Sequence, residues 1–445
     1  MARILITNAR LVNEQTIATG DVLIRNGRIE SIGGDLGSRS ADTIIEAAGR
    51  ALLPGLIDDQ VHFREPGLTH KGDIGSESRA AVAGGITSFM EMPNTIPTTT
   101  DNQTLEEKRA IAARSAHANF AFYLGATNTN IEAVKSLDPL KSCGVKVFMG
   151  ASTGDMLVDD PKTLEAIFAG SPVIVATHCE DTPTIVANEA RFRKQYGEDV
   201  PLHCHPAIRS REACLKSSSL AIDLARRHGT RLHVLHLTTA EELDLFRAAP
   251  TREKAITAEV CAHHLFFNDA DYATHGALIK CNPSIKRETD RQALLQAVRD
   301  GRIDIVATDH APHTREEKQG TYFKAPSGLP LVQYALLSLL EHYQRGELEL
   351  PLIVEKTSHA VARLFDIKDR GFIREGYWAD LVLVDLDRPL LVEPEAVIGK
   401  CGWSPFEGYR FRSSIAMTLV NGRIVYRDGQ VIASPPGMPL EFDRA

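Results

Sequence analysis

Hydrophobic runs of strand length alternate with helix-like stretches through the middle of the chain. The apolar runs lie at residues 56–62, 86–90, 120–124, 145–149, 173–178, 232–237, 255–260 and 303–308. Helical patterns lie at residues 76–83, 105–113, 162–169, 210–228 and 291–299, with two more at 329–344 and 352–365. Near-continuous apolar strands separated by helices are typical of a parallel sheet covered on both faces. The pattern therefore predicts an α/β protein built on a closed (β/α)8 TIM barrel.

An open, doubly wound parallel sheet is the alternative arrangement of the same elements. Such a sheet normally begins with a glycine-rich phosphate turn. Neither G-x-G-x-x-G nor G-x-x-x-x-G-K-[ST] occurs in the sequence. This absence favours the barrel.

The two ends of the chain carry matching alternating patterns. Strands are predicted at residues 4–9, 21–25 and 28–32 near the start, and at 379–385, 414–420 and 423–426 near the end. The dipeptides Asn26–Gly27 and Asn421–Gly422 each predict a hairpin turn. We expect one small β-sandwich module built from both termini, with residues 1–53 and 369–445 flanking a barrel at 54–368. Two separate hairpins packed on the barrel are the alternative.

Composition narrows the class of protein. The formal net charge is −8 and the pI about 6.1, without a basic stripe, so a nucleic-acid partner is not expected. No apolar stretch approaches the ~20 residues of a membrane helix, and residues 1–12 alternate like a strand rather than a signal peptide. We expect a cytoplasmic enzyme with a small-molecule substrate. A homo-oligomer, taken as a dimer, is expected on base rates.

The seven cysteines show no C-x-x-C pair, which argues against a zinc finger or a disulfide framework. Cys143, Cys179, Cys261 and Cys281 lie in or beside apolar runs. We expect them to be buried free thiols.

Polar side chains recur where the predicted barrel strands end. His62 ends the first strand, Lys146 lies in the fourth, His178 ends the fifth, His236 lies in the sixth and Asp309 follows the eighth. Active sites of such barrels form at the C-terminal ends of the strands. Imidazole and carboxylate groups are zinc ligands, so their convergence predicts a metal site.

Each of these residues also has a plainer interpretation. A single histidine ending a strand is more often a hydrogen-bonded core residue, and Asp309 alone could cap a helix. Lys146 lies in a strand expected to be buried, where an ammonium is costly unless it is paired or neutralised. A buried ion pair and carboxylation to a carbamate that bridges two cations are both open for Lys146.

Seven positions or short segments of the chain match a known set of motifs in the same order. They are residues 57–67 (IDDQVHFREPG), 91–95 (EMPNT), Lys146, 177–180 (THCE), 235–238 (LHLT), 280–283 (KCNP) and 308–313 (TDHAPH). They resemble the motifs of the dihydroorotase family of the amidohydrolase superfamily: the first resembles D-x-H-x-H followed by x-R-E-P-G, the second M-P-N-T, and the last T-D-H-A-P-H. The resemblance runs from about residue 50 to 330.

The resemblance implies a zinc centre of one or two ions bridged by N6-carboxylated Lys146. One metal would take His62, Lys146 and Asp309, and the other Lys146, His178 and His236. Asp309 would also be the catalytic proton carrier. One position departs from the family pattern, because Gln60 stands where the first histidine of D-x-H-x-H is expected. An amide oxygen is a poorer ligand than imidazole, so the metal count stays open.

The resemblance also implies the reaction, the reversible cyclisation of N-carbamoyl-L-aspartate to L-dihydroorotate in pyrimidine biosynthesis. Substrate binding is expected from Arg64, Asn94, Asn282, His313, Ser327 and Gly328. His264 and His310 are further candidates for the pocket. Two alternatives remain: an allantoinase or hydantoinase with the same metal ligands, and a non-catalytic homologue that supports a partner such as aspartate transcarbamoylase.

Overall fold

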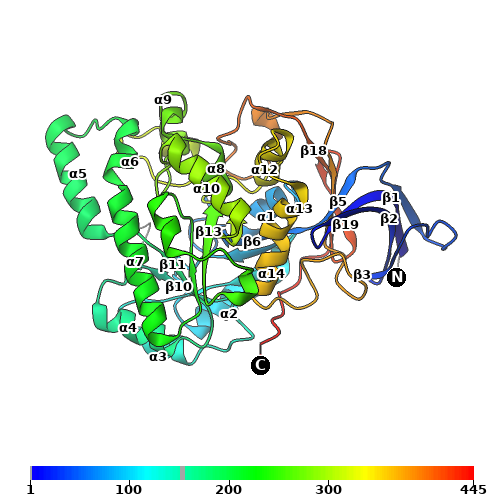
Figure 1. Cartoon of the computed structure of the whole chain (residues 1–445), viewed down its shortest axis with the longest axis horizontal. Coiled ribbons are helices and arrows are strands. Elements are labelled where there is room, and N and C mark those ends of the chain that lie inside the picture. The colour runs from blue at the N-terminus through cyan, green and yellow to red at the C-terminus, as the bar shows by residue number, and fades with distance from the viewer. Residues whose placement is uncertain (1–2, 151–155, 445) are drawn as a thin grey trace.

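The computed structural model describes residues 3–150 and 156–444. Parallel strands form a barrel in the middle of the chain (Figure 1). These strands are β6 (Leu56–Val61), β7 (Ile86–Glu91), β8 (Asn119–Phe122), β9 (Leu124–Gly125), β10 (Val145–Phe148), β11 (Val175–His178), β12 (Leu232–Val234), β13 (Ile256–Cys261) and β14 (Ile305–Ala307). Because β8 and β9 are two segments of one strand interrupted at Tyr123, the predicted eight barrel strands are all present.

The barrel closes between its first and last strands. One ladder runs β6-β7-β8 and the other β14-β13-β12-β11-β10-β9, and every pairing within them is parallel. A parallel bridge joins Val61 to His310, where His62 N donates to His310 O at 2.7 Å. These pairings confirm the closed barrel over the open sheet.

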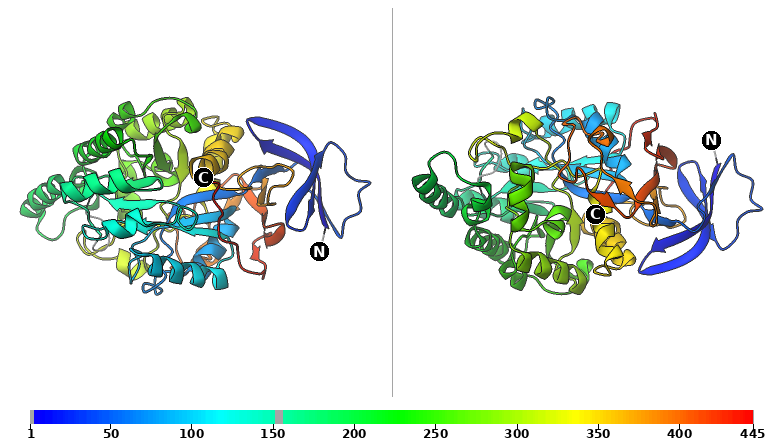
Figure 2. Two further views of the ribbon diagram at one scale, coloured as in Figure 1. Left: turned by 90° about the horizontal axis from the view of Figure 1, so that it is seen from below. Right: turned by 90° about the horizontal axis from the view of Figure 1, so that it is seen from above.

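Helices surround the barrel (Figures 1 and 2). The predicted helices appear as α1 (Ile74–Ala83), α2 (Asn102–Ser115), α4 (Pro161–Gly170), α7 (Arg211–His228) and α10 (Glu288–Asp300). Four of them begin at a side chain that accepts a backbone N–H of the first turn, which satisfies an otherwise unpaired donor. Those N-caps are Asp73, Asp101, Asp160 and Ser210.

The longer helices differ from the prediction at two points. The helix expected at residues 329–344 is α12 (Ala335–Gln344), which begins later because Leu329 pairs with His310 instead of entering the helix. Helix α5 (Thr182–Tyr196) was not predicted. Ile185 is the one residue of α5 that is buried, so the helix lacks the apolar stripe by which a surface helix is recognised.

Strands from both ends of the chain form one sheet beside the barrel. Its order is β20-β19-β18-β15-β5-β1-β2-β3, with β4 paired to β1. These strands are β1 (Arg3–Asn13), β2 (Thr16–Arg25), β3 (Arg28–Gly33), β4 (Thr43–Glu46), β5 (Ala51–Pro54), β15 (Leu381–Asp385), β18 (Ser414–Val420), β19 (Arg423–Arg427) and β20 (Gln430–Val431). The two ends meet where β5 pairs with β15, from Leu381 opposite Pro54 to Val384 opposite Ala51. The shared terminal module is therefore present, and the two-hairpin alternative is wrong.

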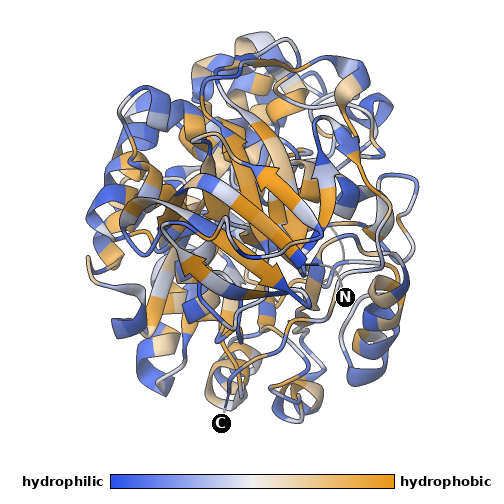
Figure 3. Cartoon of the chain, turned by 90° about the vertical axis from the view of Figure 1, so that its right-hand side faces the viewer, coloured by the Kyte–Doolittle hydropathy of each residue, from blue (hydrophilic) through white to orange (hydrophobic). Residues whose placement is uncertain are grey.

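The two predicted Asn-Gly turns lie against each other. Asn26, Gly27, Asn421 and Gly422 all have positive φ angles, between 52° and 81°, as a two-residue hairpin turn requires. A Cβ on Gly422 would lie 2.5 Å from the Cα of Gly27, so a side chain cannot fit between them. Seen from the end that carries this sheet, its strands are mostly hydrophobic (Figure 3).

Candidate metal and substrate site

The predicted site residues meet in one cavity at the C-terminal ends of the barrel strands. Its lining comprises Gln60, His62, Arg64, Asn94, Lys146, Phe148, His178, His236, Asn282, Asp309, Ala311, Ser327 and Gly328. Every predicted site residue lines it except His313, which contacts Arg64 from behind. The structure thus brings together residues that are far apart in the sequence: Gln60 and Gly328, the first and last of them, are separated by 268 positions.

His62 and Asp309 face each other at one side of this cavity. Asn94 Oδ1 lies 2.7 Å from His62 Nδ1, and because an amide oxygen only accepts, the imidazole proton is on Nδ1. His62 Nε2 then turns a lone pair toward Asp309 Oδ1 at 3.2 Å. Burial lowers the pKa of His62, which favours this neutral form. Two acceptors at hydrogen-bond distance repel unless a cation lies between them.

His178 and His236 form a second pair of facing nitrogens. His178 Nε2 lies 3.1 Å from Glu180 Oε2, and His178 Nδ1 lies 3.0 Å from His236 Nε2. Arg209 donates to the same Glu180 oxygen at 2.6 Å. Burial opposes ionisation of Glu180, but Arg209 and His178 keep its pKa below the ordinary value. A carboxylate that holds the far nitrogen of an imidazole orients the near nitrogen toward a metal.

Lys146 lines the same cavity as these two pairs. Its side chain is buried, with 1% exposure, and its Nζ lies 4.8 Å from the centre of the Phe148 ring. Among the described residues it forms no hydrogen bond and no ion pair, so the buried ion pair considered for it is not observed. Burial lowers the pKa of Lys146 to about 8, against the attraction of Asp309 and Glu259. At neutral pH a larger fraction of Lys146 is therefore neutral than of an ordinary lysine. The neutral amine is the form that reacts with CO₂.

A divalent metal fits this arrangement. About 3.3 Å separates two nitrogen ligands of a tetrahedral zinc ion with Zn–N bonds of ~2.0–2.1 Å. The facing atoms of His62 and Asp309 lie 3.2 Å apart, and those of His178 and His236 lie 3.0 Å apart. Gln60 Oε1 and His236 Nδ1 are also buried without a hydrogen-bond partner in the part of the chain that the structure describes. Converging donors of this kind suit zinc.

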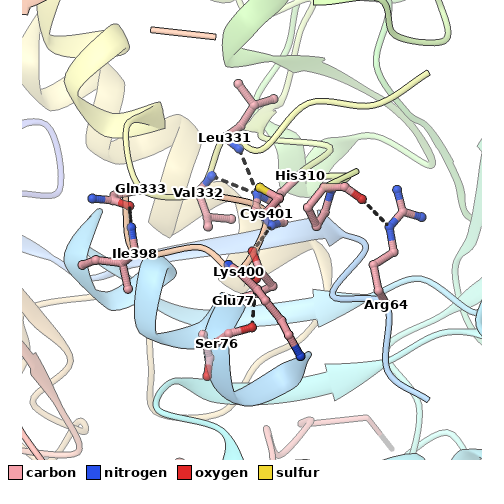
Figure 4. Close-up of polar contacts among 12 residues, drawn as sticks. Arg64, Ser76, Glu77, His310, Leu331, Val332, Gln333, Ile398, Lys400 and Cys401 are labelled. Carbon is pink, nitrogen blue, oxygen red and sulfur yellow. Dashed lines mark hydrogen bonds and ion pairs between the residues drawn. The ribbon is translucent and has the colours of Figure 1, made fainter. Parts of the chain in front are cut away.

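Arg64 reaches the cavity as a buried cation. Its Nε donates to Pro312 O at 3.1 Å, and its side chain forms no ion pair with a carboxylate within residues 3–150 and 156–444 (Figure 4). Burial lowers the pKa of Arg64 to about 10, so it remains charged at neutral pH. A guanidinium presents a fixed fork of donors that matches a carboxylate.

His313 lies behind Arg64 and leaves that guanidinium incompletely satisfied. Its Nε2 lies 3.1 Å from Arg64 Nη2 and 3.1 Å from Ser327 O, while Lys71 Nζ lies 3.1 Å from its Nδ1. Lysine only donates, so Nδ1 accepts and the ring proton is on Nε2, where it is donated to Ser327 O. Arg64 Nη2 then faces an N–H group rather than an acceptor. His313 therefore positions the wall of the cavity.

Asn282 and the loop at Ser327 and Gly328 form another part of the cavity wall. When the side-chain amide of Asn282 is oriented with its nitrogen toward Cys281 and Ser327, it donates to Cys281 O at 3.0 Å and to Ser327 Oγ at 3.1 Å. Its amide oxygen then accepts from Arg209 at 3.1 Å. Gly328 has φ +145°, and a Cβ there would lie 2.5 Å from Ala311 O. Glycine is therefore required at this point of the wall.

Lys318 holds this loop, and sequence reasoning missed it. Its buried Nζ donates to Lys280 O at 3.2 Å, Pro326 O at 2.9 Å and Gly328 O at 2.9 Å. Lys280 Nζ in turn donates to Ala325 O at 2.6 Å. Lys318 follows a run of charged residues, a pattern that predicts a solvent-exposed helix. The sequence therefore gives no sign of the buried contacts that Lys318 makes in the fold.

Three residues of the site have strained backbones. Arg64, His236 and Asp309 have φ angles of +73°, +41° and +49°. The left-handed region costs a residue other than glycine about 1–3 kcal/mol, and such strain gathers at functional sites. Glu259 Oε1 accepts from His236 N at 3.1 Å, which helps to hold that residue in place.

Two further clusters of ligand-type side chains lie outside the cavity lining. Asp59, His233 and Glu259 form one, and Cys261, His263 and His264 form the other. All six are buried. The sequence shows the run E-V-C-A-H-H at residues 259–264. It does not show that Asp59 and His233, on other strands, lie beside Glu259.

His264 and His310, the two further candidates for the pocket, do not contribute to it. His264 Nε2 lies 3.2 Å from Pro283 O, and His310 Nε2 lies 2.9 Å from Glu77 Oε2. Neither ring lines the cavity. All seven cysteines are free, and the four thiols expected in the interior are buried.

The comparison with known families identifies the class to which this fold and site belong. Residues 51–425 match the model of the amidohydrolase family, and the chain belongs to that family. Within it, the chain is similar to proteins that hydrolyse cyclic amides, and it is an enzyme of that class.

Two curated relatives and one solved structure are similar to the chain over almost its whole length. It is 34% identical to a dihydroorotase of Halobacterium salinarum, with 96% of this chain and 99% of the relative covered. It is 33% identical to an allantoinase of Solibacter usitatus, with 99% and 97% covered. The L-hydantoinase (dihydropyrimidinase) of Arthrobacter aurescens has a similar structure, with a TM-score of 0.94, 26% identity, and 99% and 100% coverage.

Across the described residues, no helix has both the length and the apolar character that crossing a bilayer requires.

Proposed function

We propose that the protein is a zinc-dependent dihydroorotase, which interconverts N-carbamoyl-L-aspartate and L-dihydroorotate in pyrimidine biosynthesis. The observation that carries this proposal is Arg64, a buried guanidinium without a carboxylate partner among the described residues. Truncating one partner of a buried charge pair costs about 2–5 kcal/mol, so an unpaired buried cation favours an anionic ligand. Dihydroorotate carries such a carboxylate beside its ring amide, whereas hydantoin and allantoin do not.

His62, Lys146, His178, His236 and Asp309 would hold one or two zinc ions, with Lys146 carboxylated as the bridge. When bound, zinc would polarise the ring carbonyl and lower the pKa of water. Carboxylation would replace an ammonium by an anion, which removes a cation from the cavity that both ligand pairs line. Lys146, with no partner of its own among the described residues, is free to be converted.

Asp309 is proposed to move the proton. In ring opening, the oxygen of water bonds to the ring carbonyl carbon and the carbon–nitrogen bond breaks. Asp309 takes the proton of the attacking water and gives it to the departing nitrogen. Burial raises the pKa of Asp309, whereas the nearby charge of Lys146 lowers it, and the net pKa lies below the ordinary value. The residue is thus ionised and ready to accept a proton, and ring closure runs the same steps in reverse.

The remaining side chains are proposed to orient the substrate. Arg64 and Asn94 would bind the carboxylate, while His313 fixes the guanidinium of Arg64. Asn282 would join them by giving up its hydrogen bond to Ser327 Oγ. The backbone of Ser327 and Gly328 would hydrogen-bond the amide edge of the ring. Both residues line the cavity.

Allantoinase or hydantoinase activity is the second candidate, favoured by the Solibacter usitatus relative and by the L-hydantoinase structure. One assay separates the two: ring opening of L-dihydroorotate, allantoin and hydantoin by the same sample, with zinc measured per chain. We expect dihydroorotate to be turned over at least about 100-fold more efficiently than the other two. Equal or better turnover of allantoin or hydantoin would show that the proposed substrate is wrong.

A further inference from the structure

A buried carboxylate–imidazole pair lies beside the catalytic loop but outside the cavity (Figure 4). Glu77 on α1 is fully buried, and His310, which follows Asp309, is 1% exposed. His310 Nε2 lies 2.9 Å from Glu77 Oε2. The functional site described above does not use this pair.

Hydrogen bonds fix the tautomer of the imidazole and the orientation of both side chains. Leu331 N donates to His310 Nδ1 at 2.9 Å, so the ring proton is on Nε2 and is donated to Glu77. The other oxygen of Glu77 accepts from Lys400 N and from Ser76 Oγ, both at 2.9 Å. Each polar atom of the pair therefore has a partner from a different segment of the chain. The imidazole cannot rotate without leaving a buried group unsatisfied.

The backbone of His310 contacts His62, one expected metal ligand, and is bonded directly to Asp309, another. His310 O accepts from His62 N at 2.7 Å, and His310 N donates to the Thr308 hydroxyl at 2.9 Å. Asp58 Oδ2 holds that hydroxyl at 2.6 Å. Asp309 lies between these anchored neighbours with its strained φ of +49°.

We propose that Glu77 and His310 are positioning residues that hold His62 and Asp309 at the spacing needed to bind metal and to transfer a proton. Because Gln60 replaces a stronger ligand at this side of the cavity, the placement of the two remaining side chains matters more. The activity part of this inference rests on the proposed function, whereas the metal part does not.

Substitution of Glu77 by glutamine tests the pair with little change of shape. A glutamine has one acceptor oxygen, so its amide nitrogen must face either Lys400 N or the N–H of His310. Either choice places two donors against each other in the interior. Supporting groups of this kind are worth about 10–100-fold in metal affinity or activity. For Glu77→Gln we expect a 10–100-fold lower kcat, a KM within about threefold, and a zinc affinity reduced at least about tenfold.

Two substitutions of His310 separate hydrogen bonding from packing. His310→Phe fills the same space without polar atoms, and we expect it to match Glu77→Gln. His310→Gln retains a donor toward Glu77 and an acceptor near Leu331, and we expect it to recover part of kcat. The matched control is Glu347→Gln, which alters another carboxylate–imidazole contact, at His342, remote from the cavity. The control should leave both kcat and zinc affinity unchanged.

Nitrogen-15 NMR of labelled histidine gives a readout that needs no substrate. In wild-type protein without added metal, we expect the Nε2–H form of His310, lost in Glu77→Gln. If Glu77→Gln keeps wild-type zinc affinity and kcat, or if only Tm falls, the positioning role is wrong. If no cyclic amide is turned over by the wild-type enzyme, the proposed function fails, and zinc affinity still decides this inference.

Discussion

Gln60 Nε2 donates a hydrogen bond to Asp309 Oδ1 across 3.2 Å. An amide thus occupies the place where the family pattern has an imidazole ligand. Its Oε1 is buried and has no hydrogen-bond partner in the described chain, so the amide oxygen is available to a cation. This side of the cavity keeps His62 and Asp309 but offers zinc a weaker third donor.

Replacing Gln60 by histidine should strengthen this side of the metal centre. We expect Gln60→His to bind zinc at least about tenfold more tightly at its weaker site, because imidazole is the better zinc ligand. The measurement is zinc per chain after dialysis against a graded chelator. Gln60→Asn is the control, since it keeps an amide of shorter reach. An unchanged zinc content in Gln60→His would show that this side does not bind metal.

Removal of the Arg64 guanidinium should discriminate between substrates. We expect Arg64→Ala to lower kcat/KM for dihydroorotate at least about 30-fold, the lower end of the 2–5 kcal/mol cost of a broken buried pair. Any residual turnover of hydantoin should change by less than about threefold, since hydantoin has no carboxylate. Arg64→Lys keeps the positive charge but loses the paired donors of the guanidinium. Its loss of kcat/KM for dihydroorotate should therefore be smaller than that of Arg64→Ala. Equal losses for both substrates would favour the hydantoinase alternative.

Asp309→Asn should separate metal binding from proton transfer. A positioned acid or base contributes typically 10²–10⁴-fold, so we expect kcat to fall at least about 1,000-fold. Zinc should remain at one equivalent or more, because His178 and His236 are unchanged. Wild-type turnover in this variant would exclude Asp309 as the proton carrier. A wild-type protein that binds zinc but opens no ring would instead point to the non-catalytic alternative.

Carboxylation of Lys146 should depend on pH in the metal-free protein. Burial lowers its pKa from 10.5 to about 8, so the ammonium is disfavoured in the fold and the neutral amine gains with rising pH. The rate of CO₂ uptake should therefore increase roughly tenfold per pH unit up to about pH 8 and then level off. The check is the carbamate signal in NMR after addition of ¹³C-bicarbonate, with Lys146→Ala as the blank. If Lys146→Ala retains both zinc and activity, the carbamate is wrong.

The sequence predicts the barrel well because its strands are apolar and nearly continuous. It predicts the cavity because strand ends of a closed barrel must converge, which places His178 beside His236 without knowledge of any distance. Local irregularities escape this reasoning. The ladder between β6 and β7 shifts register between Asp58 and Val61, so that neighbours Asp59 and Gln60 both contact groups inside the barrel. Strict alternation would have placed them on opposite faces.

Long-range polar contacts are the other part that the sequence conceals. Glu77 reads as an ordinary residue in the first turn of a helix, yet its partner His310 is 233 positions away. Lys318 reads as surface charge but donates to three buried carbonyl groups. No periodicity records such pairs, because each depends on how the loops above the barrel meet.

The pairing of β5 with β15 has a consequence for biosynthesis. Strand β5 is followed directly by the first barrel strand, but its partner leaves the ribosome more than 300 residues later. Until then one edge of the early strands stays open, a state that invites association with other chains. Synthesis therefore starts the terminal sheet first and completes it last, and that edge stays unpaired until β15 has been made.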